Sequence, residues 1–452
     1  MSTLNENESA LFYEVTYQVR PDLTLVANSQ TVALLAPMMS AAKPSLQYCK
    51  TCRQSTKLLA ITQRNNSVKS PEASNSVQHL PRSGIRRVFD EASKYPDCIR
   101  LEVGEPSFTT PQHIKDAAQA ALNSDFTKYT PNAGIAELRE GLSHKLRDRN
   151  KILVAPEQIV VTPGGVASVF SSLTALLNRG DEVLLADPSW PNYLQMTILL
   201  GAVPVFYPLR IENDLVPTAA DIESKITSKT KVLLLNSPGN PSGAIIPESE
   251  LVAILQVAKK HNLWVISDEV YDEIYFDKPP VSLQPLDEEG RVISVFSFSK
   301  TYAMTGWRVG YLTGPMSIVS HILRAQEPIT SCVNSVAQKA AFAAVTGDQS
   351  CVSEMRNAYA KRAALVTKIL TEKGVKFAQP TGAFYTMVDI TASGMSDVDF
   401  VSRMITEKRV AVVPGSAFGP DSGNFVRVSL ASSESDLEQG ASRLAAAIKE
   451  WA

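Results

Sequence analysis

One segment, directly after the apolar run Val292–Phe298, combines a lysine and an arginine at a spacing that suggests covalent chemistry. The run is rich in β-branched and aromatic residues and predicts a strand that ends where Lys300 begins the next segment. A desolvated lysine amine loses its proton more easily and becomes a nucleophile that can form an imine with an aldehyde. Arg308 can hold a phosphate by a two-pronged contact, with the hydroxyls of Ser297 and Ser299 as further donors. These groups suit a phosphorylated aldehyde, although a lone lysine here would also fit a solvated loop.

A second candidate is the turn at residues 163–168, which lies between a predicted strand and a predicted helix. The backbone N–H groups of Gly165, Val166 and Ala167 can point at an anion from this position. Two glycines at such a turn more often serve tight backbone geometry. The turn therefore becomes a phosphate site only in combination with Arg308.

Three more candidate residues lie within or directly after predicted strands. Asp268 and Tyr271 follow the strand at residues 263–267, so Asp268 is expected at the same sheet edge as the lysine. Taken alone, the aspartate fits a helix N-cap and the tyrosine a packed aromatic. Arg427 interrupts the apolar strand Phe425–Ser429, and packing alone does not explain an arginine there.

The run Ser297–Gly310 resembles, position by position, the lysine motif of class I pyridoxal 5'-phosphate aminotransferases. At least six motifs in the family's order extend this resemblance from about Ser83 to the C-terminus. The resemblance implies that Lys300 carries pyridoxal 5'-phosphate as an internal aldimine. It implies phosphate contacts for Ser297, Ser299 and Arg308, and for the turn that contains Gly165, Val166 and Ala167.

Further cofactor contacts follow from the same resemblance. Asp268 would pair with the pyridine nitrogen and keep the ring protonated, so that the ring withdraws electrons from the substrate Cα. Tyr271 would donate a hydrogen bond to the phenolic oxygen. Trp190, which alone would fit a core position, would stack on the ring. Tyr129 would bind the phosphate of the neighbouring subunit, which implies a homodimer with shared active sites.

The substrate contacts are also implied by the resemblance. Arg427 would grip the α-carboxylate with its two-pronged guanidinium, and the backbone at Gly104 would touch the same group. Asn240, which by composition lies only in a turn, would contact both a cofactor oxygen and the carboxylate. Trp190 would border the substrate as well as the ring.

Helical and strand patterns alternate along the body of the chain and predict an α/β fold with a mostly parallel sheet covered on both faces. The resemblance implies the fold type I of pyridoxal-phosphate-dependent transferases, with a sheet of the seven-stranded type. The predicted large cofactor-binding domain is residues 128–334, and a small α+β domain combines residues 81–127 with 335–452. The predicted elements are helices near 113–124, 136–150, after 165 and 351–374, and strands at 158–162, 182–186, 231–236, 263–267, 291–298, 383–390 and 425–430.

Composition excludes several other functions. The chain has 452 residues with 44% hydrophobic and 20% charged residues, and its net charge of −2 gives no general attraction to nucleic acid or an anionic membrane. No apolar run is long enough to span a bilayer. Cys49 and Cys52 lack a second pair or a nearby histidine, and the five histidines are scattered, so no metal site is expected.

The first 80 residues differ from the rest. Residues 23–70 contain no Asp or Glu but six lysines and arginines among Ser, Thr, Asn and Gln, which is typical of a targeting peptide for a plastid or mitochondrion. Glu6, Glu8, Glu14 and Asp22 fit such a signal less well. The alternative is a disordered tail on a cytoplasmic protein.

The expected activity is a ping-pong transfer of the amino group of an L-amino acid to a 2-oxo acid, with Lys300 as the general base. Related aspartate and prephenate aminotransferases carry a lysine for the distal carboxylate where this chain has Val166, which predicts broad, neutral or aromatic substrates with aspartate possible. Arg86 or Arg87 could supply a cation from elsewhere. A carbon–sulfur lyase or an aminocyclopropane carboxylate synthase would share the same core residues. A transcription regulator would need a DNA-binding domain that residues 1–80 do not suggest.

Overall fold

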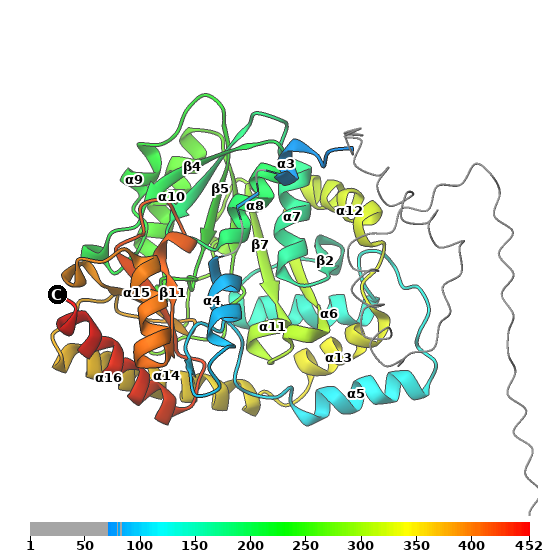
Figure 1. The fold of residues 1–452 in the computed structure, drawn as a ribbon. Helices are drawn as coiled ribbons and strands as arrows, with labels where there is room; N and C mark the ends of the chain where they lie inside the picture. Colours follow the sequence, from blue (N-terminus) through cyan, green and yellow to red (C-terminus); the bar gives the residue numbers. More distant parts are fainter. Residues whose placement is uncertain (1–70, 79, 82–83) are drawn as a thin grey trace, which may run out of the picture. The chain divides into compact units, whose positions relative to one another are not determined.

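A seven-stranded β-sheet forms the centre of the computed structural model, which describes residues 71–78, 80–81 and 84–452 (Figure 1). Residues 73–452 form one compact unit. The predicted tail or targeting segment, residues 1–80, lies almost entirely outside the described residues. What the sequence predicts for it stays a prediction.

The order of strands in the large sheet is β2-β8-β7-β6-β5-β3-β4. All neighbours run parallel except β8, which is antiparallel to both β2 and β7. This confirms the predicted α/β fold with a mostly parallel sheet, while β4 and β8 were not predicted. The strands are β2 Ile159–Thr162, β3 Glu182–Asp187, β4 Val203–Pro208, β5 Thr230–Asn236, β6 Trp264–Asp268, β7 Val292–Ser297 and β8 Gly310–Thr313.

Both faces of this sheet are buried, which explains why its central strands are continuous apolar runs. In β5, Val232 and Leu234 pack into the core on one face, and Leu233 and Leu235 into the core on the other. Successive side chains of a strand point to opposite faces, so one run serves both cores.

Helices cover the two faces. The first face carries α7 Gly165–Leu176, α8 Pro191–Leu199 and α12 Met316–Thr330. The second face carries α9 Ala219–Glu223 and α10 Glu248–Lys260, and, beside β2, the helices α5 Gln112–Asn123, α6 Ala136–Lys145 and α13 Ser335–Thr346. The predicted helix at 136–150 is α6 continued by a π-helical turn over Leu146–Asn150.

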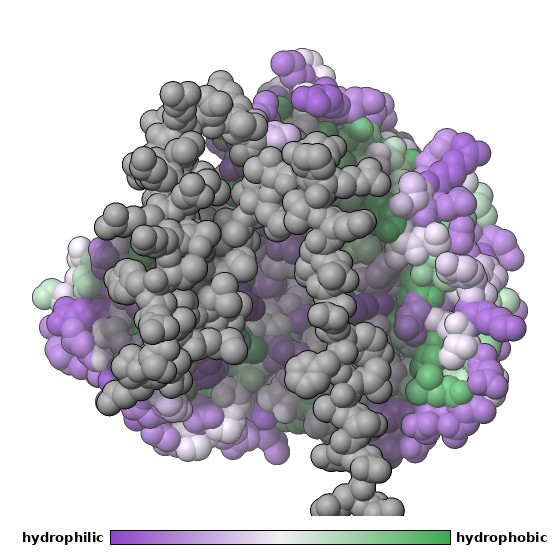
Figure 2. Space-filling model, turned by 45° about the vertical axis from the view of Figure 1, so that its right-hand side comes forward, coloured by the Kyte–Doolittle hydropathy of each residue, from purple (hydrophilic) through white to green (hydrophobic). Residues whose placement is uncertain are grey.

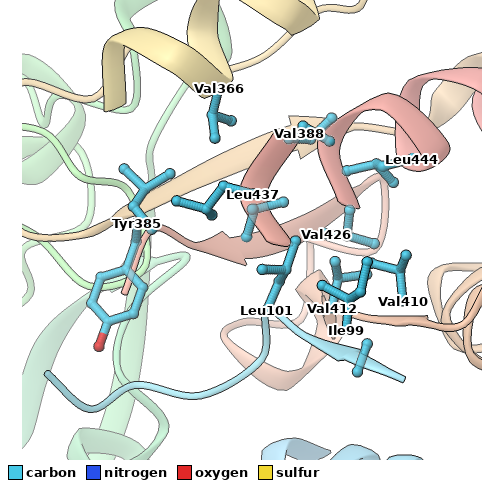
Figure 3. Close-up of a cluster of buried hydrophobic side chains, with 14 of the residues drawn as sticks. Ile99, Leu101, Val366, Tyr385, Val388, Val410, Val412, Val426, Leu437 and Leu444 are labelled. Atoms are coloured by element: carbon cyan, nitrogen blue, oxygen red, sulfur yellow. The ribbon is translucent and has the colours of Figure 1, made fainter. Parts of the chain in front are cut away.

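A second core lies around two smaller sheets (Figure 3). In one, β1 Ile99–Arg100 pairs in parallel with β10 Val410–Ala411. In the other, β12 Phe425–Ser429 is antiparallel to both β11 Val413–Pro414 and β9 Tyr385–Asp389. The helices of this region are α4 Gly84–Ala92, α14 Ser350–Glu372, α15 Asp397–Arg403 and α16 Glu434–Glu450.

These packing relations bear on the predicted division into domains. The side chains of α14 and α16 share the second core, and the two helices run side by side in Figure 1. By contrast, α13 packs with α5 and α6 beside the large sheet, although the prediction placed residues 335–346 in the small domain. The domain boundaries stay a prediction.

Hydrophilic side chains cover most of the described surface in the view of Figure 2, with smaller hydrophobic patches between them. Two further α-helices of the described residues are short, namely α3 Asn75–Gln78 and α11 Phe298–Thr301. Within the described ranges, no helix has the length and apolar character needed to cross a bilayer. The same ranges contain no group of three or more His, Cys, Asp or Glu residues arranged to hold a metal ion.

Candidate active site

A cavity of about 230 Å³ collects most of the predicted site residues. It lies at the carboxyl ends of β5, β6 and β7, where ligands bind in open α/β sheets. Because these strands are parallel and adjacent, Asn236 at the end of β5 pairs in register with Asp268 at the end of β6. The predicted residues that line the cavity are Gly104, Gly165, Val166, Trp190, Asn240, Asp268, Tyr271, Ser297, Ser299, Lys300, Arg308 and Arg427.

Lys300 lies in α11, the single helical turn that directly follows β7. Its Nζ donates a hydrogen bond to the backbone carbonyl of Gly104 at 2.7 Å. Burial lowers the pKa of Lys300 to about 8, with the nearby carboxylate of Glu105 acting in the opposite direction. A lysine with such a pKa is unprotonated far more often at neutral pH than an ordinary one, as a nucleophile or base must be.

Asp268 is buried at the end of β6, and its hydrogen-bond donors among the described residues are neutral. Tyr193 donates its hydroxyl to Oδ2 at 2.6 Å, and the N–H of Val270 donates to Oδ1 at 3.3 Å. Burial raises the pKa of Asp268 to about 6, and these two bonds only partly oppose that effect. A cation in the cavity would restore the charged form, so the site suits a protonated ring nitrogen.

Tyr271 lines the same side of the cavity from the turn after β6. Its hydroxyl lies 3.1 Å from that of Tyr385, and its ring packs edge-on against Phe384. Burial raises the pKa of Tyr271 well above its ordinary value. The phenol therefore keeps its proton at neutral pH and is available as a donor.

The opposite end of the cavity is built to receive an anion. Gly164 precedes α7 with a φ of +86°, and a Cβ there would lie 2.5 Å from Nη2 of Arg308. Glycine thus allows the guanidinium to approach the start of the helix, whose first N–H groups have no partners within the helix. Arg308 is held there by hydrogen bonds from Nη1 to Thr305 O at 2.7 Å and from Nη2 to Pro163 O at 3.3 Å.

Two predicted anion contacts have other partners in the structure. The N–H of Ala167 donates to the carbonyl of Gly164 at 3.1 Å, and Ala167 does not line the cavity. The reason is that α7 already begins at Gly165, so its third residue reaches back to the capping residue. The hydroxyl of Ser297 accepts the N–H of Ser299 at 3.2 Å and caps α11.

Arg427 lies on β12 and lines the cavity. It is almost fully buried, with 1% of its surface exposed. Nη1 donates to Oδ1 of Asn240 at 3.0 Å, and Nη2 donates to the carbonyl of Glu102 at 2.7 Å. Its Nε has no recorded partner among the described residues. A buried cation that borders a cavity and keeps a free donor suits a carboxylate ligand.

Aromatic rings hold this guanidinium from two sides. Its Cζ lies 4.5 Å from the ring centre of Tyr385 and 4.9 Å from that of Phe418. The loop that carries Phe418 is fastened to the end of β3, where Asp187 accepts hydrogen bonds from Ser422 Oγ at 2.5 Å and from the N–H of Asp421 at 2.8 Å.

Six residues that line the cavity were not predicted as site residues, namely Ile85, Tyr193, Asn236, Val270, Thr305 and Tyr385, and three of them hold other site residues in place. Tyr193 lies on α8, three positions after Trp190, which is the N-cap residue of that helix. Because positions i and i+3 share a helix face, this spacing could have indicated Tyr193 as a site residue. Tyr385 lies on β9, whose pairing with β12 puts it on the same face as Arg427, two positions from the direct partner Met387. Asn236 holds the next loop by accepting the N–H of Asn240 at 2.7 Å.

Tyr129 does not reach the cavity of its own chain. Its side chain is 93% exposed and borders a separate surface hollow that also contains Phe126, Lys128 and Lys339. The prediction that Tyr129 serves the neighbouring subunit requires such an outward position, and it stays a prediction.

Comparison with known proteins identifies the family. Residues 96–444 match the family described as aminotransferase class I and II. The chain belongs to this family. The aspartate aminotransferase of Pyrococcus abyssi is 40% identical, in an alignment that covers 81% of this chain and 96% of that protein. The aromatic-amino-acid aminotransferase 2 of Thermococcus litoralis is 38% identical, with 83% and 98% covered.

Solved structures agree with this membership. The aspartate aminotransferase of Thermus thermophilus with maleate superimposes with a TM-score of 0.79 at 35% identity, covering 84% of this chain and 100% of that chain. The aromatic aminotransferase of Pyrococcus horikoshii gives a TM-score of 0.76 at 38% identity, covering 80% and 99%. The chain is therefore an amino-acid aminotransferase of the predicted fold type. The lyase alternatives are not favoured, because these relatives are named as aminotransferases.

Proposed function

We propose that this aminotransferase uses pyridoxal 5'-phosphate to move the amino group of an L-amino acid to a 2-oxo acid, with a broad or a neutral and aromatic substrate range in which aspartate is possible. The observation that supports the proposal is the meeting of Lys300, Asp268, Arg308 and Arg427 in one cavity. When bound, the cofactor supplies an aldehyde for an amine and a protonated ring that withdraws electrons from the substrate Cα.

The fit to this cofactor rests on complementary groups at the two ends of the cavity. Asp268 is a buried carboxylate with neutral partners and suits the ring nitrogen, and Tyr271 suits the phenolic oxygen. The start of α7, with Arg308 beside Gly164, suits the phosphate. Trp190 lines the cavity with a flat face that can cover the ring.

Proton transfer is assigned to Lys300. Its amine lines the cavity and has a pKa of about 8, so it can take a proton from the substrate Cα and return it near neutral pH. Arg427 and Asn240 would orient the α-carboxylate, with the backbone of Gly104 on the same side. Holding the carboxylate at these groups keeps the Cα within reach of the amine.

The proposed substrate range follows from the charges of the cavity. Among the described residues that line it, the cations are Lys300, Arg308 and Arg427, and each already has a role. The apolar side chains of Ile85 and Val166 line it as well. A second carboxylate on the substrate would therefore lack a partner, whereas a neutral or aromatic side chain would not. Of the four relatives and solved structures named above, two are named for aspartate and two for aromatic amino acids, which is compatible with either preference.

A panel of amino donors tests this range directly. Phenylalanine, methionine, alanine and aspartate would each be measured with 2-oxoglutarate, pyruvate and oxaloacetate as acceptors. We expect at least one neutral donor to match or exceed aspartate in kcat/KM. A catalytic efficiency with aspartate far above that of every neutral donor would overturn the proposed range, and the absence of transfer with any donor would overturn the activity.

We also propose a homodimer in which Tyr129 contributes to the partner's active site. Its 93% exposure and its position outside the cavity support this proposal. Mixing Lys300→Ala and Tyr129→Phe chains provides a test, because only hybrid dimers would contain one site with both native residues. Activity above the sum of the two single variants is expected, and a monomer by light scattering would contradict the proposal.

The proposed location is a plastid or a mitochondrion, on the basis of the acid-poor, basic segment at residues 23–70. A fluorescent protein fused behind residues 1–80 should accumulate in one of these organelles. Diffuse cytoplasmic fluorescence would favour the alternative of a cytoplasmic protein with a disordered tail.

A further inference from the structure

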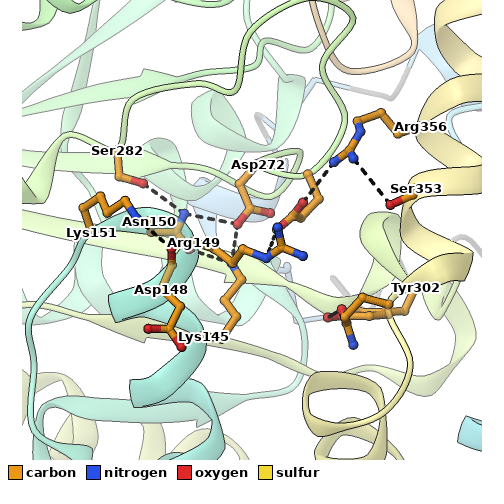
Figure 4. Close-up of polar contacts among 12 residues, drawn as sticks. Lys145, Asp148, Arg149, Asn150, Lys151, Asp272, Ser282, Tyr302, Ser353 and Arg356 are labelled. Carbon is orange, nitrogen blue, oxygen red and sulfur yellow. Dashed lines mark hydrogen bonds and ion pairs between the residues drawn. The ribbon is translucent and has the colours of Figure 1, made fainter.

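The last residue of β6 and the turn that follows it present two sets of polar side chains to opposite sides. Asp268 and Tyr271 line the cavity. Glu269 and Glu273 are buried away from it, and the side chain of Asp272 is only 7% exposed. Three acidic side chains behind a catalytic turn need partners, because unpaired buried charges are strongly unfavourable. Their partners come from several other elements, and Figure 4 shows the contacts around Asp272.

Asp272 forms an ion pair with Lys145 from the last turn of α6. The Nζ of Lys145 also donates to Oδ1 of Asn150 at 2.8 Å, and Asn150 Nδ2 reaches Asp272 at 3.3 Å and Ser282 Oγ at 3.0 Å. We call Lys145, Asn150, Asp272 and Ser282 the anchor cluster. Burial alone would lower the pKa of Lys145, but the neighbouring carboxylates, above all Asp272, raise it above its ordinary value. Lys145 thus stays charged and the pair stays formed.

The two glutamates are fixed in other directions. Glu269 accepts hydrogen bonds from Ser267 Oγ at 2.9 Å and from Ser294 Oγ on β7 at 3.1 Å. Oε2 of Glu273 lies 3.4 Å from Nη1 of Arg356 on α14, and its Oε1 lies 3.9 Å from Nε of Arg149. The turn is therefore tied to α6 with its π-helical extension, to β7 and to α14. Directional polar contacts of this kind specify a position more than they add stability.

From this arrangement we propose that Lys145 and Asp272 are positioning residues that hold Asp268 and Tyr271 at the cofactor ring. The proposal rests on the use of pyridoxal 5'-phosphate proposed above. Neither Lys145 nor Asp272 lines the cavity, so both act through the turn. Loss of the pair lets the turn shift, which weakens the contacts of Asp268 with the ring nitrogen and of Tyr271 with the phenolic oxygen. Active-site groups need such support from behind to stay within a fraction of an ångström of their working geometry.

The test measures the bound cofactor and not only turnover. Lys145→Met and Asp272→Asn would be compared with the native holoenzyme in cofactor affinity, by equilibrium dialysis, and in the pH titration of the cofactor's visible absorbance. We expect affinity to fall about tenfold and the titration midpoint to move by about half a pH unit or more, because the environment of the ring changes. Lys145→Arg, which keeps the charge, should restore most of both properties.

A matched control separates positioning from general stability. Arg291 is also a largely buried cation, 14% exposed against 11% for Lys145, but it lies at the amino end of β7, away from the cavity. Arg291→Met should lower the thermal midpoint without changing cofactor affinity or the absorbance titration. If Lys145→Met and Asp272→Asn lower only the thermal midpoint, as the control does, the proposal is wrong.

Two further measurements keep the test decisive. If Lys145→Met does not fold, Asn150→Ala interrupts the anchor cluster without leaving a net buried charge, and it should still weaken cofactor binding by a severalfold factor. Unchanged cofactor binding in a folded Asn150→Ala chain would count against the proposal. If the native chain itself shows no cofactor binding, the failure lies in the proposed function and not in the role of Lys145.

Discussion

The end of the cavity proposed for the cofactor ring, which contains Asp268 and Tyr271, and the region proposed for the substrate side chain are built in different ways. At the proposed ring end, Asp268 at the end of β6 and Tyr271 in the following turn are each hydrogen-bonded to a buried tyrosine, and charged residues brace that turn. In the proposed side-chain region, Ile85 and Val166 contribute apolar surface, and Val166 is 37% exposed. Polar networks behind a site restrict it to one geometry, whereas apolar residues at its rim can change with little effect on neighbours. The difference suggests a fixed reaction centre with an adjustable choice of substrate.

The largest effect is expected from Lys300→Ala, which removes the amine at the fixed end. Turnover should fall by at least about 1,000-fold, because nucleophile and general base are lost together. Initial rates and the visible absorbance of the cofactor would both be measured. Lys361→Ala, which removes an exposed lysine, serves as the control. Normal turnover in Lys300→Ala would show that the reaction does not take place in this cavity.

Asp268→Asn should be the next most damaging change. Without a carboxylate the ring nitrogen is not held in its protonated form, and turnover should fall by about 100-fold or more. Tyr193→Phe removes only the hydrogen bond to that carboxylate and should cost about tenfold. Measuring kcat with excess cofactor separates these effects from weak binding. Equal losses for both variants would contradict the distinction between the reacting group and its support.

Val166→Lys probes the adjustable region. A cation there would offer a partner to a second carboxylate, so the ratio of kcat/KM for aspartate to that for phenylalanine should rise by about 10- to 50-fold. Val166→Leu, which keeps an apolar side chain, should leave the ratio nearly unchanged. A ratio that does not respond to the lysine would show that substrate side chains are bound elsewhere.

The pKa of Lys300 gives a smaller effect that can be measured without substrate. Its folded-state pKa, about 8, lies below its ordinary value, so the unprotonated amine increases as pH rises through 8. The rate at which the cofactor-free protein takes up pyridoxal 5'-phosphate should therefore rise about tenfold between pH 7 and 9 and then level off. Stopped-flow absorbance at constant ionic strength would record it. A rate independent of pH would mean that the free amine does not limit uptake.

Sequence patterns predicted those parts of the fold that are encoded locally. The central strands are continuous apolar runs and were recognised, whereas β8 has only four residues, begins at Gly310, the last residue of the lysine motif, and was missed. β4 was missed because Val203 is exposed and two prolines interrupt its pattern. Its place at the sheet edge explains both features.

The site was predictable where a motif contains its own functional residues. The run around Lys300 and the strand with Arg427 are of this kind. Tyr385 and the anchor cluster were not, because their roles depend on contacts such as Lys145 with Asp272, which are 127 positions apart. No local pattern encodes which distant side chain a buried charge will meet.

Arg427 also has a consequence for the order in which the chain can fold during synthesis. Its side chain donates hydrogen bonds to Oδ1 of Asn240 and to the backbone carbonyl of Glu102. These two residues precede it by 187 and 325 positions. Apart from Tyr129, the proposed contacts to the cofactor phosphate and ring lie between Gly165 and Arg308, so these residues have all been synthesised while the ribosome is still adding the last strands. The clamp for the substrate carboxylate can close only after β12 has emerged, and such long-range contacts form slowly. With the proposed use of pyridoxal 5'-phosphate, a nascent chain would thus be able to hold this cofactor before it is able to recognise an amino acid.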